Sequence, residues 1–306
     1  MVAADSMVKE FLSAHLGKIY HPFLHRLRHK SEYAPLKPIL RNSLATMRRL
    51  RVNLPDFVEP GSVTGRTAIQ IHIFYTDLLG EFYDHLKGIS VPYDLYISTD
   101  TEEKKKEIES FFYINALSAG NVCVKVFENR GRDVYPFLAQ LHDRISAYEY
   151  LAHFHTKKSV NSDFGDFWRR SLLCSLLGGG ERFDRIVQFL VKNCSYGLII
   201  PEIPKMSSLK WGYAATKADL WNEREVKGEL SNFGMNVDGF KLSDYEHPAG
   251  TMFVARTKAV RQVFEKLVAP ESFPEESGQQ NHTRQHALEL VWHPVCEKNG
   301  YKIAVV

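Results

Sequence analysis

Two short polar segments carry most of the side chains that could do chemistry. They are residues 128–133 (Glu-Asn-Arg-Gly-Arg-Asp) and residues 155–159 (His-Thr-Lys-Lys-Ser), and each follows an apolar run. Guanidinium and ammonium groups bind phosphate oxygens, and a glycine lets the backbone turn tightly. The pattern therefore favours a pocket for an anion such as a diphosphate. The alternative is a pair of solvated loops, with Asp133 capping a helix that begins at Val134.

The elements that would position these segments alternate between strands and helices from residue 66 onward. Apolar runs predict strands at 68–75, 93–98, 121–127 and 150–155. Helical patterns follow the first three of these strands, at 78–86, 102–112 and 134–145. This alternation predicts an α/β fold with a mainly parallel central sheet. Ligands of such sheets bind beyond the carboxyl ends of the strands. The rule adds Tyr75, Ser98, Thr99 and Asp100 to the candidate site.

Glycine-rich motifs narrow the type of nucleotide site. The chain has no G-x-x-x-x-G-K-[ST] motif, and no G-x-G-x-x-G motif follows the first predicted strand. Both absences argue against a P-loop and against a dinucleotide-binding fold. The three glycines at 178–180 follow a helical apolar run, which indicates the end of a helix.

Composition excludes several other classes of protein. The chain has 306 residues, of which 44% are hydrophobic and 25% charged, so it can bury a sizeable core. A net charge of +3 is too small to indicate a nucleic-acid partner. Cys123, Cys174, Cys194 and Cys296 form no C-x-x-C pair, which argues against a zinc site or a disulfide scaffold. With no membrane-spanning run and no signal peptide, we expect a cytoplasmic protein.

The first 65 residues differ in character from the rest. Apolar positions recur at helical spacing, and between Lys18 and Arg51 the only acid among many bases is Glu32. Residues 53–61 contain two prolines and a glycine and read as a loop. We therefore predict a basic helical segment over 1–65 and a second domain over 66–306. The basic helices suit contact with anionic lipid, and a packed appendage or a partner-docking region suits them equally.

The ordered motifs of residues 66–303 resemble those of the rhamnan synthesis protein F family. The matching stretches are 71–75, 93–99, 128–133, 153–159, 197–201, 248–256 and 273–276. The resemblance implies a glycosyltransferase catalytic domain over 66–306 with a Rossmann-like A-type fold. It also implies a donor such as dTDP-L-rhamnose, and as acceptor an oligosaccharide or lipid-linked glycan of a bacterial surface polysaccharide of the O-antigen type. Such an enzyme would work in the cytoplasm, where residues 1–65 would suit peripheral contact with the inner face of the cell membrane.

The resemblance assigns donor binding to the predicted strand ends. Ser98, Thr99 and Asp100 would lie near the base and ribose, and Arg130, Arg132, Lys157 and Lys158 would contact the diphosphate. The full set of expected donor-binding residues is Tyr75, Ser98, Thr99, Asp100, Asn129, Arg130, Arg132, Asp133, His155, Lys157 and Lys158.

A metal-binding Asp-x-Asp pair, usual in A-type folds, is replaced here by His153 and His155. Residues two apart point to the same face of a strand, so both histidines could bind Mg²⁺ or Mn²⁺. The lysines that follow favour a reaction that requires no cofactor, because fixed cations can neutralise the leaving diphosphate. The other interpretation of His153 is an inward-facing strand residue with satisfied hydrogen bonds.

An inverting transfer needs a carboxylate base. Glu276 is the candidate, with Asp244 and Glu275 as rivals, and an exposed loop carboxylate without a role as the alternative. Trp211, Tyr213 and His286 are the expected acceptor contacts, and core packing explains the tryptophan equally well. Two positions depart from the family pattern, because Asn281 replaces an aspartate and His282 a glycine. His286 and Glu289 lie one helical turn apart, where a mutual hydrogen bond is another interpretation.

Two other functions remain open. The missing Asp-x-Asp pair and the Asn281 substitution suit a non-catalytic glycan-binding or scaffold module of a polysaccharide assembly complex. A metal-dependent hydrolase using His72, His153 and His155 is the third hypothesis, and it lacks the usual ligand spacings.

Overall fold

The computed structural model describes residues 50–59, 61–156, 158, 164–202, 222–266, 268–279 and 281–306. All of them belong to one compact unit, Ala45–Val306. Most of the predicted basic segment, together with Lys157, Trp211 and Tyr213, lies outside the described residues. The predicted boundary near residue 65 therefore stays a prediction.

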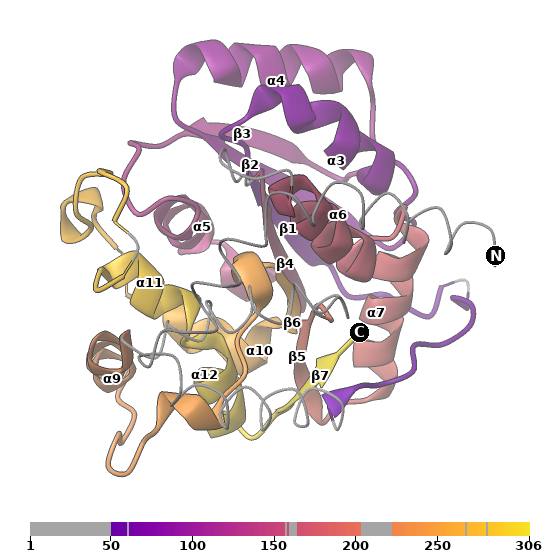
Figure 1. Cartoon of the computed structure of the whole chain (residues 1–306). Coiled ribbons are helices and arrows are strands. Elements are labelled where there is room, and N and C mark those ends of the chain that lie inside the picture. The colour runs from indigo at the N-terminus through magenta and orange to yellow at the C-terminus, as the bar shows by residue number, and fades with distance from the viewer. Residues whose placement is uncertain are drawn as a thin grey trace, which may run out of the picture. The chain divides into compact units, whose positions relative to one another are not determined.

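A seven-stranded sheet forms the centre of the described part of the chain, in the order β3-β2-β1-β4-β6-β5-β7 (Figure 1). The strands are β1 (Thr67–His72), β2 (Tyr93–Thr99), β3 (Val122–Val126), β4 (Tyr150–His155), β5 (Tyr196–Ile200), β6 (Phe253–Arg256) and β7 (Lys302–Val305). β6 is antiparallel to both of its neighbours, whereas the other pairings are parallel. The prediction of a mainly parallel sheet is confirmed.

Helices follow the strands of the first half as the sequence predicts. They are η2 (Thr76–Leu78), α3 (Leu79–Leu86), α4 (Glu102–Ile114), α5 (Val134–Leu141), η3 (Ile145–Ala147), α6 (Phe164–Leu176) and α7 (Glu181–Lys192). The predicted helix 134–145 ends early, at Leu141. α6 ends at Leu176, and the backbone N–H of Gly178 bonds the carbonyl of Leu173. All three glycines at 178–180 have positive φ, so the predicted helix stop is confirmed.

The second half contributes shorter elements. They are α9 (Glu223–Asn232), η5 (Leu242–Asp244), η6 (Ala249–Thr251), α10 (Thr257–Val260), η7 (Arg261–Phe264), η8 (Pro270–Ser272), α11 (Arg284–Glu289) and α12 (Trp292–Lys298). α5 and α12 lie on one side of the sheet, and α6 and α7 lie on the other (Figure 1). None of the helices within the described residues has the length and apolar character needed to cross a membrane.

An aromatic cluster fills the core between the sheet and the α5–α12 layer. Phe137 of α5 stacks on His153 of β4 with ring centroids 4.0 Å apart. Trp292 of α12 packs against Phe137 and against Phe253 of β6, at 5.6 and 4.5 Å between centroids. Because these side chains are fully buried, the cluster fixes α5 and α12 against the strands.

The parallel register places polar residues in rows across this same face. Gln70 of β1 lies beside His153 of β4, and His72 lies beside His155 on one side and Ser98 on the other. These polar residues are all buried. Buried polar groups need partners, so the row must form its own hydrogen bonds. It leads to the carboxyl ends of β1 and β4.

Candidate functional site

A pocket of about 310 Å³ opens at the carboxyl ends of β1 and β4. The chain order reverses here, because β2 and β3 lie on one side of β1 and β4 on the other. Open α/β sheets bind ligands at such switch points. The lining residues are His72, Phe74, Tyr75, Asn129, Arg132, Asp133, His155, Thr156, Lys158, Gly250, Thr251, Glu276 and Glu289.

The lining divides by burial into a floor and a mouth. The floor consists of buried residues, namely His72, Asp133, His155, Thr156 and Thr251. The mouth consists of the half-buried or exposed residues, namely Phe74, Tyr75, Asn129, Arg132, Lys158, Gly250, Glu276 and Glu289. Polar groups thus lie at both depths of the pocket.

Asp133 belongs to the floor through a bond to the sheet. Its Oδ2 accepts from Nε2 of His153 at 3.1 Å, and its side chain makes no hydrogen bond to the start of α5. The helix-capping interpretation of Asp133 is therefore wrong. The other nitrogen of His153, Nδ1, bonds Oε1 of Gln70 at 2.8 Å. The interpretation of His153 as an inward-facing residue with satisfied hydrogen bonds is confirmed.

Backbone carbonyls orient the hydrogen bond at Nδ1 of His153 through two glutamines. The amide nitrogen of Gln140 donates to the carbonyls of Ile97 and Cys123, so its oxygen must face Gln70. The amide nitrogen of Gln70 in turn donates to Gln140 and to Ser98. The amide oxygen of Gln70 therefore accepts the hydrogen bond from His153. Nδ1 of His153 therefore carries hydrogen and donates to Gln70, and Nε2 faces Asp133.

Asp133 is an anion. Burial raises the pKa of its carboxyl, but the nearby charge of His155 and the hydrogen bond from His153 hold that pKa well below its usual range. His153 and the carboxylate of Asp133 form a buried hydrogen-bonded pair. Oδ1 of Asp133 bonds no other described residue.

The two remaining histidines of the floor have different partners. His72 Nδ1 lies 2.9 Å from the hydroxyl of Ser98, and burial lowers the pKa of His72 from 6.5 to about 4. His72 is therefore neutral at pH 7. His155 Nε2 donates to the carbonyl of Gly250. The next residue, Thr251, has a φ of 56°, a left-handed conformation that is rare for a β-branched residue.

The 128–133 segment is shaped by a second left-handed turn. Gly131 has a φ of 63° and Arg132 a φ of 54°. A Cβ on Gly131 would lie 2.7 Å from the ring of Phe273, so only glycine fits this position. Arg130 and Glu275 form an isolated antiparallel bridge, which aligns the loop with residues 273–279. Two of the three non-glycine residues with positive φ in the described part of the chain, Arg132 and Thr251, line the pocket.

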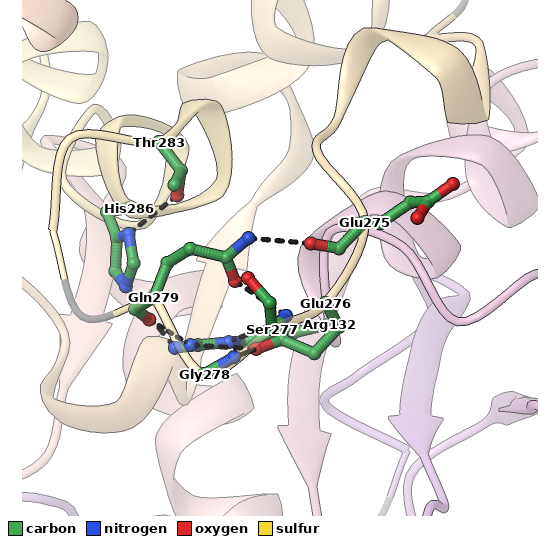
Figure 2. Close-up of polar contacts among 8 residues, drawn as sticks. All are labelled: Arg132, Glu275, Glu276, Ser277, Gly278, Gln279, Thr283 and His286. Carbon is green, nitrogen blue, oxygen red and sulfur yellow. Dashed lines mark hydrogen bonds and ion pairs between the residues drawn. The ribbon is translucent and has the colours of Figure 1, made fainter.

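Arg132 ties three parts of the site together (Figure 2). Nε and Nη2 donate to the two carboxylate oxygens of Glu276, at 3.1 and 3.3 Å, and Nη2 also donates to the carbonyl of Gln279. Nη1 lies 3.3 Å from Nε2 of His286, which accepts because a guanidinium only donates. His286 then donates Nδ1–H to the hydroxyl of Thr283 at 2.6 Å.

Glu276 is held as a carboxylate by these contacts. Burial raises its pKa, but the hydrogen bonds and charge of Arg132 and the backbone N–H of Gly278 lower it below the usual range. Figure 2 shows residues 275–279 folded beside the guanidinium of Arg132. The side chain of Gln279 closes this turn by donating to the carbonyl of Glu275 at 2.6 Å and accepting from Ser277 N–H at 3.0 Å.

Lys158 is another cation of the mouth. Its ammonium pairs with Asp77 and lies 4.9 Å from the ring centroid of Tyr75. The backbone N–H groups of Phe74 and Tyr75 both donate to the hydroxyl of Thr156, at 2.9 and 3.0 Å. These bonds join the ends of β1 and β4 and place the two aromatic rings at the pocket.

Seven of the predicted residues come together in the lining: Tyr75, Asn129, Arg132, Asp133, His155, Lys158 and Glu276. Other predicted residues lie outside it. Ser98 bonds Gln70 and His72 beneath the floor, Asp100 pairs with Lys104, and Arg130 pairs with Glu128 and Glu275. Thr99, Asp244 and His286 also lie outside the lining.

Six lining residues were not among the predicted donor-binding, acceptor-binding or catalytic residues: His72, Phe74, Thr156, Gly250, Thr251 and Glu289. Each lies in or beside a motif that the sequence had singled out. His72 ends the first strand, and Gly250 and Thr251 belong to the 248–256 motif. His72 was named only as a ligand in the hydrolase hypothesis, and Thr156 only as part of the 155–159 segment.

The two departures from the family pattern have structural consequences. Asn281 accepts from the side chain of buried Asn222 at 3.4 Å, and it does not line the pocket. His282 has a φ of 60°, the conformation in which glycine is the least strained residue. The backbone N–H of His282 donates to the side chain of Asn222 at 2.6 Å. Both residues join the start of α11 to α9.

The two histidines of β4 do not fit a divalent-metal site. Both ring nitrogens of His153 are hydrogen bonded, and Nε2 of His155 donates to a carbonyl. The described residues contain no group of three or more His, Cys, Asp or Glu side chains placed to hold a metal ion.

The fold and the site together define an α/β protein with a polar ligand pocket at the switch point of a mostly parallel sheet. The chain belongs to the rhamnan synthesis protein F family, whose model matches residues 7–301. The family resemblance of residues 66–303 is thus confirmed, and the match extends through most of the basic N-terminal segment.

Curated relatives are found in Xanthomonas campestris pv. campestris. The "uncharacterized protein WxcX" of each of two strains is 27% identical to this chain over 288 residues. The match covers 93% of this chain and 39% of each relative. The chain therefore spans well under half the length of the curated relatives that it matches.

Proposed function

We propose that this chain is a glycosyltransferase that moves a sugar from a nucleotide-sugar donor to a growing bacterial surface polysaccharide. The family is named for rhamnan synthesis, so the proposed sugar is rhamnose and the proposed donor dTDP-L-rhamnose or a close analogue. The proposed acceptor is an oligosaccharide or a lipid-linked glycan.

The position of the pocket is the observation that carries the proposal. The strand order β3-β2-β1-β4 is that of one half of a Rossmann-like sheet, and the pocket lies at the β1/β4 switch point. Polar side chains from three separate strand ends converge there. This arrangement supports a Rossmann-like transferase fold of the A type.

The proposed reaction is an inverting transfer. The acceptor oxygen forms a bond to the anomeric carbon while the bond from that carbon to the diphosphate breaks, and the diphosphate leaves with the electron pair. Glu276 takes the acceptor proton, and it suits this role because it lines the mouth and is ionised at neutral pH. Lys158 offsets the charge of the leaving group, so that no metal is required.

A thermal-shift screen of the purified chain against nucleotides and nucleotide sugars tests the donor class. A ligand that binds only the folded chain at about 100 times its Kd adds about 2.7 kcal/mol to the free energy of unfolding. We expect stabilisation by one nucleotide class, of equal size with and without Mg²⁺ or Mn²⁺. No stabilisation by any nucleotide would contradict the proposal, and a shift that needs metal would contradict its metal-independent form.

A second candidate function is a non-catalytic module that binds a glycan or nucleotide sugar within an assembly complex. The ion pair of Glu276 with Arg132 favours it, because a carboxylate satisfied by a guanidinium is a weak base. Ligand binding without product formation would support this candidate.

A further inference from the structure

The floor of the pocket contains three polar atoms that bond no other described residue. They are Oδ1 of Asp133, Nε2 of His72 and the hydroxyl of Thr251. Asp133 and His72 are each 7% exposed and Thr251 is 2% exposed. None of the three is among the fully enclosed polar atoms without a partner, so each faces the open cavity, where a few polar groups orient a bound ligand. Their position at the bottom of a cavity therefore points to a ligand with hydroxyl groups.

The charge of the floor excludes a phosphate from this position. Oδ2 of Asp133 bonds His153, and the oxygen that faces the cavity, Oδ1, belongs to an ionised carboxylate. A phosphate placed there would face a buried carboxylate at close range, where repulsion is strong. A sugar hydroxyl instead donates to such an oxygen in a strong, charge-assisted hydrogen bond.

The mouth of the pocket contains a cation that can bind phosphate. Lys158 is half-buried beside the ring of Tyr75, so a cation and an aromatic face lie together nearer to solvent. Burial thus orders the lining from hydroxyl-accepting groups inside to a phosphate-binding cation outside.

We propose that the floor formed by Asp133, His72 and Thr251 binds the sugar ring of the donor through its hydroxyl groups, with the diphosphate at the mouth beside Lys158. This assignment rests on the proposed transferase function. It makes Asp133 the residue that distinguishes a sugar-bearing nucleotide from the bare nucleotide. His153 positions Asp133 by bonding its other oxygen, Oδ2.

Calorimetric titration of the full chain with dTDP, dTDP-L-rhamnose and free L-rhamnose tests the assignment. For the wild-type chain we expect dTDP-L-rhamnose to bind at least tenfold more tightly than dTDP. Asp133→Asn should remove that difference and leave the dTDP affinity within about twofold, because the lost interaction is a charged hydrogen bond to the sugar alone. Asp143→Asn is the matched control, since Asp143 is 90% exposed, and it should change neither affinity.

Thr251→Val is a second variant that keeps the side-chain shape and removes only the hydroxyl. It should also reduce the preference for dTDP-L-rhamnose, which keeps the test decisive if Asp133→Asn fails to fold. Equal loss of both affinities in these variants, or an unchanged preference, would overturn the assignment.

The free sugar separates this assignment from the proposed function. If L-rhamnose binds and Asp133→Asn abolishes that binding, while neither nucleotide binds, the sugar-binding role of the floor is supported and the transferase function is contradicted. If both nucleotides bind the wild-type chain with equal affinity, only the sugar-binding role of the floor is contradicted. No binding of any probe would contradict both.

Discussion

At the scale of single residues, the hydrogen bonds of the floor are set by neighbours that never reach the pocket. The carbonyls of Ile97 and Cys123 orient Gln140, which orients Gln70 so that its amide oxygen accepts from Nδ1 of His153. The other ring nitrogen of His153 then faces Asp133, whose pKa is held below its usual range although it is buried. The site depends on this chain of hydrogen bonds as much as on the lining itself.

His72 makes stability depend on pH in a predictable direction. Its pKa is about 4 in the folded chain, against 6.5 as the ordinary value, so between these values the unfolded chain binds more protons. The contribution of neutral His72 is complete above pH 6.5 and is lost as pH falls toward 4. Asp133 opposes the shift, whereas His155 and His153 add to it.

His72→Asn removes this titration. Between pH 7 and pH 4 the wild-type chain should lose on the order of 3 kcal/mol more unfolding free energy than the variant does. Urea unfolding at a series of pH values measures the difference. Parallel pH profiles for the two chains would show that His72 is not held neutral by burial.

At the scale of elements, two loops from distant parts of the chain form one side of the pocket. Residues 128–133 follow β3 and residues 273–279 precede α11, and the Arg130–Glu275 bridge and the Arg132–Glu276 ion pair join them. The close fit depends on the absence of a side chain at Gly131.

Gly131→Ala tests that fit. A left-handed φ costs alanine about 1 kcal/mol, and the contact of the new Cβ with Phe273 and Tyr135 adds about 1–3 kcal/mol. Gly228→Ala is the control, because this exposed position in helix α9 has open space around a Cβ, and it should stabilise the chain by about 0.5–1 kcal/mol. Denaturant unfolding of both variants measures these values, and equal effects would refute the packing argument.

At the scale of the whole molecule, the first half of the fold could be predicted because each element has its own periodicity. β1, β2, β3 and β4 lie within a residue or two of the predicted strands, except that β1 ends at His72 and not at Tyr75. The reason is that the N–H groups of Phe74 and Tyr75 bond Thr156 instead of a neighbouring strand. The direction of β6 could not be predicted, because an antiparallel strand has the same apolar pattern as a parallel one.

The candidate site could be predicted only in part, because local sequence patterns show which segments follow the strands but not which side chains meet. The strand-end rule finds segments, and so it found Asn129, Asp133 and Lys158. The bond between His153 and Asp133 joins residues from different elements, and it depends on the register of β1 beside β4 and on the start of α5. Local sequence patterns do not contain that register.

Turnover by a Glu276→Gln variant tests the proposed chemistry most directly. Formation of glycosylated acceptor and release of dTDP from dTDP-L-rhamnose should be measured for the wild-type chain, for Glu276→Gln and for Glu275→Gln. Glu275 is the control because it is an adjacent carboxylate that pairs with Arg130 and does not line the pocket. We predict acceptor-dependent product from the wild-type chain and from Glu275→Gln, and a loss of about 10²–10⁴-fold in kcat for Glu276→Gln. Near-normal turnover by Glu276→Gln would contradict the role of Glu276 as the base. Donor binding by the wild-type chain without any product would contradict the proposed transfer reaction.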